Sequence, residues 1–217
     1  MLDRFYETIN KIYNSYENPK ILIIGKIFSE IFFDRLVIDK SNITLYFIEE
    51  PPLNHSQSVI KSTLDNYSKY NTTYSSYIEF KKWIDNSTAI YDIIFVDTVH
   101  YKECNTFILQ NCVRLAKYFL IYHDTIPKNY NWTIPIRFSE MPWCGQTYQA
   151  FYNFYLNNID NTYIVEDNFV GYGIIKIRNN MCVNYPIIKI SFEDYLKLDS
   201  FIDHDYFKTS ILNTLLI

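Results

Sequence analysis

The sequence predicts a single α/β domain with a doubly wound, mostly parallel sheet and an antiparallel hairpin at one edge. Three observations support this prediction. Strand-length apolar runs alternate with segments of helical spacing along the 217 residues. Two of the runs, at 91–96 and 118–122, each end in an aspartate with a histidine close by. The stretch TYIVED-NFVGYGIIKI, at 162–177, has the pattern of a hairpin.

Each predicted element can be assigned to a segment in chain order. A helix over Asp3–Tyr16 should end at Asn18-Pro19, and the last residues, after Pro186, suggest an added strand and one or two short helices. The predicted strands are 20–25, 42–50, 72–77, 91–97 and 118–123, followed by the hairpin at 162–177. The predicted helices between them are 27–36, 56–70, 78–85, 102–117 and 145–158. We therefore expect one domain, with an N-terminal helix in 1–18, a core in 19–178 and a C-terminal extension in 184–217.

Composition and charge exclude several classes of protein. The net charge is -4, the isoelectric point is near 5.6, and no basic stretch is present, so nucleic acid is not an expected partner. The apolar runs are of strand length, so no membrane span is expected. The 4 cysteines lack the spacing of metal fingers, which favours reduced thiols in a cytoplasmic protein. The oligomeric state cannot be predicted from these features.

The ends of the two runs mark the predicted site. Asp97 and Asp124 lie 27 residues apart, about one strand–helix–strand unit. If the two strands are neighbours, their polar ends meet at one edge of the sheet. Ligands of open α/β sheets bind outside the carboxyl ends of the strands. We therefore expect Asp97, His100, His123 and Asp124 to form one site.

These motifs and their surroundings resemble the class I S-adenosylmethionine-dependent methyltransferases, particularly the branch that methylates oxygens of small molecules and sugars. The resemblance covers roughly residues 19–178. It implies the Rossmann-like class I methyltransferase fold. The matching positions are Phe95, Asp97, His100 and Glu103 in FVDTVHYKE, His123-Asp124-Thr125, Gly145 at a helix start, and Gly171 and Gly173 in GYGIIKI.

The resemblance also implies where S-adenosylmethionine would bind. Gly25 ends the first strand, as the family requires, but Ile23 occupies the usual acidic position and Ile27 occupies that of a second glycine. Glu49, one of two glutamates that close the second strand, suits the acidic residue that binds ribose hydroxyls. Ser75 (or Ser76) would meet the adenine. A strand that simply ends in acidic residues at the protein surface is the alternative.

The same family suggests two roles for Asp97, His100, His123 and Asp124. Asp97, His123 and Asp124 would hold a divalent cation such as Mg²⁺, whose ligands in proteins are of this kind. His100, with Asp97, would act as the general base, because Val99 stands where the family often has an aspartate. The structural alternatives are that His100 caps the next helix and that Asp124 starts a turn. His55 and His204 lie in polar stretches without a motif, and we expect no role for them.

Three functions remain open at the level of sequence. The first is an S-adenosylmethionine-dependent O-methyltransferase that acts on a small hydroxylated substrate, with a sugar as the suggested example. The second is a methyltransferase fold that has lost catalysis and serves as a binding or structural module, which the altered first turn favours. The third is metal-assisted chemistry at the same strand ends without this cofactor.

Overall fold

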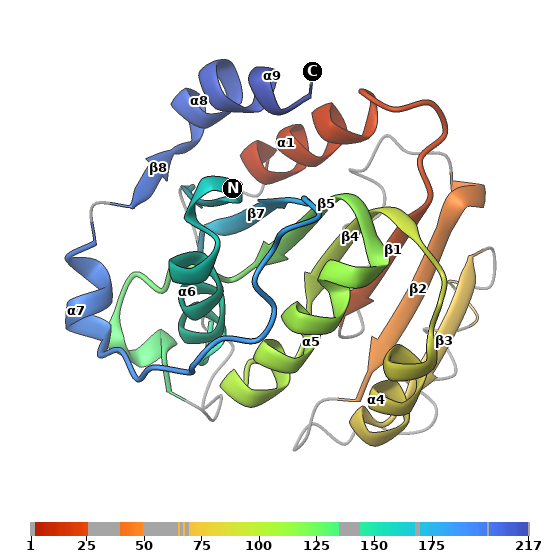
Figure 1. Cartoon of the computed structure of the whole chain (residues 1–217), viewed down its shortest axis with the longest axis horizontal. Coiled ribbons are helices and arrows are strands. Elements are labelled where there is room, and N and C mark those ends of the chain that lie inside the picture. The colour runs from red at the N-terminus through yellow and green to blue at the C-terminus, as the bar shows by residue number, and fades with distance from the viewer. Residues whose placement is uncertain are drawn as a thin grey trace.

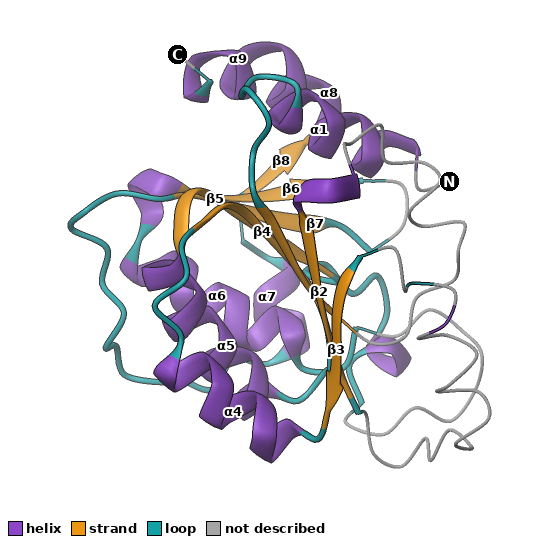
Figure 2. Cartoon of the chain, turned by 90° about the vertical axis from the view of Figure 1, so that its right-hand side faces the viewer, coloured by secondary structure: helices purple, strands orange, loops and turns teal. Residues whose placement is uncertain are grey.

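The computed structural model describes residues 3–25, 40–49, 65, 67, 70–134, 144–167, 170–198 and 200–216. The predicted helix at 27–36 and most of the one at 56–70 lie outside these residues, as does Ile27. The described residues form a layered α/β structure in which helices cover both faces of one sheet (Figures 1 and 2).

The sheet of the described residues has eight strands in the order β3-β2-β1-β4-β5-β7-β6-β8. Strands β1 to β5 pair in parallel, and β7 runs antiparallel to both β5 and β6. The strands are β1 (Ile21–Gly25), β2 (Ile43–Ile48), β3 (Asn71–Ser75), β4 (Tyr91–Asp97), β5 (Ala116–His123), β6 (Thr162–Glu166), β7 (Tyr172–Lys176) and β8 (Phe201–Asp203). The predicted mostly parallel sheet with an antiparallel hairpin is confirmed.

Helices lie on both sides of the sheet. The structure has α4 to α7 on one face and α1, α8 and α9 on the other (Figure 2). The α-helices are α1 (Asp3–Tyr13), α4 (Tyr77–Asn86), α5 (Lys102–Leu115), α6 (Thr147–Asn157), α7 (Phe192–Leu196), α8 (His204–Tyr206) and α9 (Leu212–Leu215). Shorter elements are the 3₁₀ turns η1 (Lys40–Asn42), η2 (Tyr130–Trp132) and η3 (Ile159–Asn161) and the π-helical turn η4 (Phe207–Ile211).

Two predictions of detail need correction. The helix expected over 102–117 ends at Leu115, and Ala116 already belongs to β5. The helix expected over 3–16 ends at Tyr13. The strand expected in the C-terminal extension is β8, which pairs in parallel with β6 and extends the same sheet beyond the hairpin.

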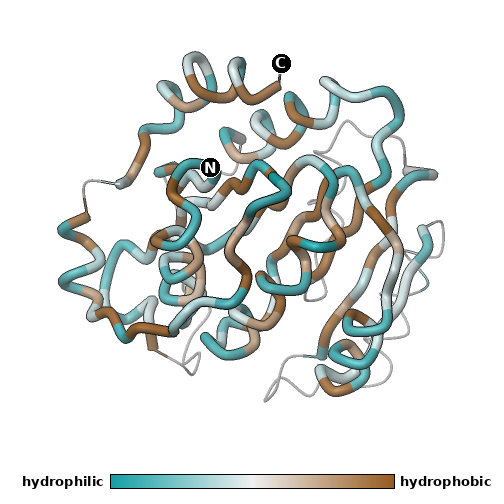
Figure 3. Tube along the Cα trace, viewed as in Figure 1, coloured by the Kyte–Doolittle hydropathy of each residue, from teal (hydrophilic) through white to brown (hydrophobic). Residues whose placement is uncertain are grey.

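Alternation along the strands produces two cores, one on each face of the sheet. In β1, Leu22 and Ile24 pack towards α4 and α5, whereas Ile21 and Ile23 pack towards α1. Strands buried on both faces explain why the runs read as continuously apolar. The helices carry both polar and apolar residues along their length (Figure 3). This two-sided burial leaves the strand ends as the natural place for polar chemistry.

No helix in the described segments combines the length and apolar character needed to cross a membrane. All four cysteines, Cys104, Cys112, Cys144 and Cys182, are free thiols, as expected from their spacing.

Candidate functional site at the carboxyl edge of the sheet

The register of the parallel strands brings the predicted site residues to one edge. Gly25 at the end of β1 is the register partner of Asp97 at the end of β4. Strands β4 and β5 are also neighbours, so His123, which ends β5, lies at the same edge. The expected convergence of the strand ends is therefore what the structure contains.

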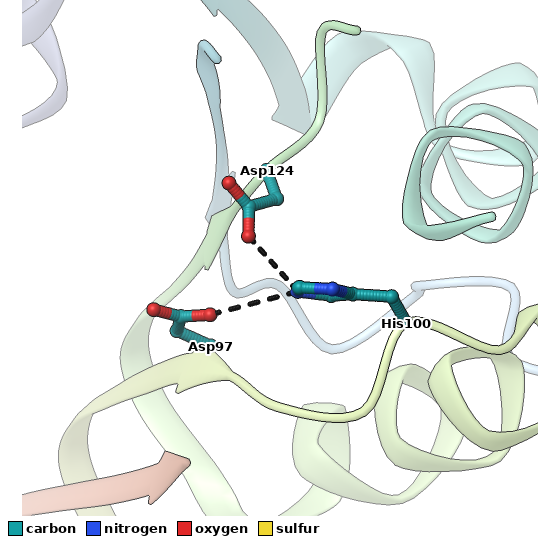
Figure 4. Close-up of side chains that lie close together, drawn as sticks. All are labelled: Asp97, His100 and Asp124. Atoms are coloured by element: carbon teal, nitrogen blue, oxygen red, sulfur yellow. Dashed lines mark ion pairs between the residues drawn. The ribbon is translucent and has the colours of Figure 1, made fainter. Parts of the chain in front are cut away.

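Four ionisable side chains form a compact cluster there, which we call the strand-end cluster: Asp97, His100, His123 and Asp124. His100 Nε2 lies 2.9 Å from Asp124 Oδ2 and 3.8 Å from Asp97 Oδ1. Figure 4 shows both carboxylates directed at the His100 ring, which arrives from the loop after β4. His123 Nδ1 lies 3.1 Å from Asp124 Oδ1 and 3.7 Å from Asp97 Oδ2. Each histidine thus faces both aspartates.

The cluster is buried unevenly. The side chains of His123, Asp97 and Asp124 are 11%, 10% and 8% exposed, whereas that of His100 is 2% exposed. A substrate that enters the site would therefore meet these three side chains before the His100 ring.

The carboxylates change the acidity of His123. Burial by itself lowers the pKa of this histidine, but the nearby carboxylates of Asp124 and Asp97 outweigh burial and raise the pKa to about 9. His123 is accordingly protonated at neutral pH and supplies a positive charge beside the two carboxylates. It cannot accept a further proton under those conditions.

The pKa of Asp124 shifts in the opposite direction from that of His123. Burial opposes ionisation, yet His123 and His100 hold the pKa of this carboxyl well below its usual range. Asp124 therefore stays ionised at neutral pH. An ionised carboxylate 2.9 Å from His100 Nε2 stabilises a positive charge on that imidazole.

Asp124 has an unusual backbone conformation. Its φ is +58°, in the left-handed region that few residues other than glycine, asparagine and aspartate adopt. The chain thus turns sharply immediately after β5, which confirms the turn considered for Asp124. His100 does not cap the next helix, because Tyr101 is the residue that precedes α5.

Two residues that the sequence did not single out hold the His100 loop. The backbone N–H of Gln146 donates to the carbonyl of His100 at 2.7 Å. The amide of Asn105 donates to the Val99 carbonyl at 2.7 Å and accepts from the Tyr122 hydroxyl at 3.0 Å. A signal for Asn105 exists, because this polar residue falls on the apolar face of its helix, three, four and seven residues before three buried positions: Ile108, Leu109 and Cys112.

The predicted cofactor residues lie at the ends of three adjacent strands. Gly25 ends β1, Glu49 directly follows β2, and Ser75 ends β3. The N–H of Glu49 donates to the Ser75 carbonyl at 3.0 Å, so these two ends are tied together. Ser75 Oγ lies 2.8 Å from the Tyr46 hydroxyl. Ser76, the alternative to Ser75, caps α4 in a capping box with Glu79.

A divalent cation has a candidate ligand set in the strand-end cluster. Ligand atoms of Asp97, His100 and Asp124 lie within 4.8 Å of one another, so His100 takes the place in this set where we expected His123. Oxygen ligands sit about 2.1 Å from Mg²⁺, so neighbouring ligands about 3 Å apart suit such an ion. Protonated His123 is a second source of positive charge at the same place. Metal binding therefore stays a prediction.

Comparisons with known proteins identify solved structures that resemble this fold. No protein-family model matches the chain, and no curated protein matches it. An O-methyltransferase from Bacillus cereus in complex with SAH is 14% identical with a TM-score of 0.53, covering 81% of this chain and 80% of that chain. Cofactor-bound Rv0187 from MTB is 14% identical with a TM-score of 0.54, covering 82% and 80%. The O-methyltransferase TomG from Streptomyces achromogenes, in complex with SAM, is 11% identical with a TM-score of 0.50, covering 82% and 78%.

The similarity to these structures is one of fold. The structural match extends over about four-fifths of this chain and of each solved chain, while the identities stay at or below 14% in these three. The fold predicted from the strand pattern and the FVDTVHYKE and HDT motifs is thus confirmed. The chain has the class I methyltransferase fold.

Proposed function

We propose that the protein is an S-adenosylmethionine-dependent O-methyltransferase that acts on a small hydroxylated molecule, such as a sugar. One observation carries the proposal. Asp97, which ends β4 and belongs to the strand-end cluster, is the register partner of Gly25, which ends β1 where the cofactor is expected. A proton-accepting group and a cofactor site would then be adjacent, as methyl transfer to oxygen requires.

The residues at three neighbouring strand ends support a cofactor site there. Gly25, Glu49 and Ser75 lie at the carboxyl ends of neighbouring strands, which is where open α/β sheets bind nucleotides. Glu49 would accept hydrogen bonds from the ribose hydroxyls, and the backbone at Gly25, which carries no side chain, would allow close approach of the methionine part. When bound, the cofactor supplies an electrophilic methyl group on a sulfonium sulfur.

The chain's own residues would then handle the proton. Asp97, which ends β4 beside Gly25, orients the substrate hydroxyl. His100 lies 3.8 Å behind it and accepts the proton as the C–O bond forms and the C–S bond breaks. Asp124 stabilises the resulting imidazolium from 2.9 Å. His123, protonated at neutral pH, balances part of the negative charge of the two carboxylates.

A divalent ion held by Asp97, Asp124 and His100, or by Asp97, Asp124 and a His123 that loses its proton on binding the metal, would serve the same chemistry. It would orient the substrate oxygen and lower the pKa of the hydroxyl. Calorimetry with Mg²⁺ in the absence of cofactor tests this part by itself. Heat that disappears in Asp124→Asn would support an ion at the cluster, and no heat in the wild type would leave the protonated His123 as the counter-charge.

One observation favours a second candidate, a methyltransferase fold used as a binding or structural module. Ile23 occupies the position where the family carries an acidic residue, and it is 2% exposed and packed in the core that faces α1. One polar contact to the cofactor would therefore be missing, so we expect weak binding of S-adenosylmethionine.

Calorimetry at millimolar S-adenosylmethionine and S-adenosylhomocysteine distinguishes the two candidates. We expect measurable heat in the wild type and affinity at least about tenfold weaker in Glu49→Ala, since a hydrogen bond to a charged group contributes about 1.5–3 kcal/mol. Glu17→Ala, an exposed acidic residue beyond α1, is the matched control and should bind like the wild type. No heat with any variant would support the module instead.

A further inference from the structure

The chain that leads into the C-terminal extension, residues 182–188, is fastened to the C-terminal part of α6. Asn153 of that helix and Asn158, which directly follows it, each pair with the backbone of this segment in both directions. The Asn158 amide donates to the Cys182 carbonyl at 2.9 Å and accepts from the Cys182 N–H at 2.8 Å. The Asn153 amide does the same with Ile188, at 3.0 and 2.8 Å. These amides act as a strand partner would, and they fix the path of residues 182–188.

The fixed path leads into the short helix α7. Ser191 caps the helix by accepting from the Asp194 N–H at 3.0 Å. Tyr195 of the same helix is fully buried, and its ring packs against three other aromatic rings at centroid distances between 5.0 and 5.6 Å: Tyr148, Tyr152 and Phe201. The place of the Tyr195 hydroxyl is therefore well determined.

That hydroxyl reaches the turn that carries Asp124. It donates to the carbonyl of Thr125 at 2.6 Å. The next residue of the turn is held from the other side, because the Ile126 N–H donates to the Val170 carbonyl at 2.7 Å. Ile126 also packs so closely on Gly171 that a Cβ there would lie 2.5 Å from Ile126 Cγ1. The backbone immediately after Asp124 is thus clamped between the C-terminal extension and the start of β7.

We propose that Tyr195 is a positioning residue for the strand-end cluster: its hydroxyl holds the Thr125 carbonyl so that the preceding Asp124 keeps the left-handed turn that directs its carboxylate at His100 and His123. The proposal assigns a role to the C-terminal extension. Its predicted effect on kcat rests on the proposed function. Its predicted effect on the positions of His100 and His123 can be measured without turnover.

The physical argument lies in the backbone of Asp124. Aspartate tolerates φ +58° better than most residues, but the conformation still costs free energy, so contacts of the neighbouring backbone help to hold it. Thr125 is fully buried, so its carbonyl would lose its Tyr195 partner in a place that water does not readily reach. Burial raises the pKa of Tyr195 well above its usual value, so the phenol remains a donor throughout the working range.

Tyr195→Phe removes the hydroxyl and keeps the ring. We expect NMR spectra of this variant to show altered imidazole resonances for His100 and His123, with His204 unchanged. In a methyl-transfer assay, kcat should fall by about tenfold to a hundredfold while the KM for the cofactor stays constant, because misplacement of a catalytic group by about 1 Å has effects of that size. Tyr152→Phe, which removes a hydroxyl from the same aromatic cluster, is the control and should leave both readouts at wild-type values.

The outcomes separate the two proposals. Altered His100 and His123 resonances in Tyr195→Phe alone support positioning even if no variant shows turnover, in which case the proposed function fails and the positioning role stands. Wild-type resonances in a folded Tyr195→Phe overturn the positioning role. If Tyr195→Phe does not fold, Asn153→Ala provides the test, since it loosens the extension at Ile188 and leaves Tyr195 intact. The same change of resonances in Asn153→Ala supports the role, and its absence overturns it.

Discussion

The described residues contain two buried histidine sites, and the groups around the histidines differ in charge between the two sites. The histidines of the strand-end cluster face the carboxylates of Asp97 and Asp124. His204, on the face covered by α1 and α8, instead places Nδ1 2.7 Å from the hydroxyl of Tyr172. That hydroxyl in turn lies 3.0 Å from Thr8 Oγ1.

The comparison shows that burial alone does not determine the chemistry of an imidazole. Burial lowers the pKa of His204, and the charges around it do not compensate. Burial also acts on His123, but the carboxylates reverse its effect and bring the pKa to about 9. The hydroxyl-bonded site is therefore suited to holding helices on the sheet, and the carboxylate-bonded site is suited to handling protons.

The largest expected difference between the two sites follows from removing one partner. Asp124→Asn keeps the shape and tolerates the left-handed backbone, but it leaves both cluster histidines with one carboxylate fewer. Breaking a buried ion pair in this way costs about 3–5 kcal/mol of unfolding free energy. Urea unfolding at neutral pH measures it. Tyr172→Phe, the equivalent change at the His204 site, should cost only about 1–3 kcal/mol, and equal losses would contradict the comparison.

The pH dependence of stability should have opposite signs at the two sites. The pKa of His123 is raised on folding, so its contribution is complete below about pH 6.5 and is lost as the pH rises to about 9. A shift from 6.5 to about 9 corresponds to roughly 3 kcal/mol. The pKa of His204 is lowered, so its contribution is present above pH 6.5 and is lost as the pH falls below that value.

Urea unfolding across this pH range, with EDTA present to remove metal ions, provides the test. His123→Gln should flatten the decline on the alkaline side and leave the acid side as it is. A variant that loses stability between pH 6.5 and 9 as steeply as the wild type would show that His123 does not carry the charge assigned to it.

Substitutions in the strand-end cluster should lower kcat about a hundredfold more than a substitution at the His204 site. His100→Ala and Asp97→Asn should each lower kcat by roughly a hundredfold or more, since His100 accepts the proton and Asp97 orients the hydroxyl that releases it. Initial rates of methyl transfer, with saturating cofactor, measure the change. His204→Ala, which alters the hydroxyl-bonded site, should keep kcat when assayed well below its melting temperature. Loss of kcat in that variant as well would remove the distinction.

The smallest expected effect concerns the hydroxyl-bonded site alone. Thr8→Val removes one buried hydrogen bond to Tyr172 and keeps the side-chain volume, so we expect a loss of about 1 kcal/mol of unfolding free energy and no change in kcat. Urea unfolding and the same rate assay measure the two quantities. A change in kcat would indicate that the two histidine sites are coupled through the sheet.

The sequence predicts which residues form the strand-end cluster, but it does not predict the His204 site. Asp97 and Asp124 end apolar runs one strand–helix–strand unit apart, and parallel neighbours must bring such ends together. His204 stands in the polar stretch DHDY and was expected to have no role. Its burial depends on Thr8 and Tyr172, which are remote in the chain and meet it only when the outer layers have packed.

The details of the cluster also exceeded what periodicity can predict. Which histidine pairs with which carboxylate depends on the left-handed turn at Asp124 and on the course of the His100 loop. Gln146 and Asn105 hold that loop through hydrogen bonds from another part of the chain and from a helix interior. The contact of Tyr195 with Thr125 joins residues 70 positions apart and has no local signature.

The central claim is that the carboxylate-bonded histidines adjoin a cofactor site and that His204 does not. Titration of S-adenosylhomocysteine into the protein, followed by NMR of the imidazole resonances, tests this claim directly. The account predicts that the resonances of His100 and His123 shift in proportion to binding while those of His204 remain in place. Binding that leaves His100 and His123 unchanged, or shifts His204 as much, would contradict it.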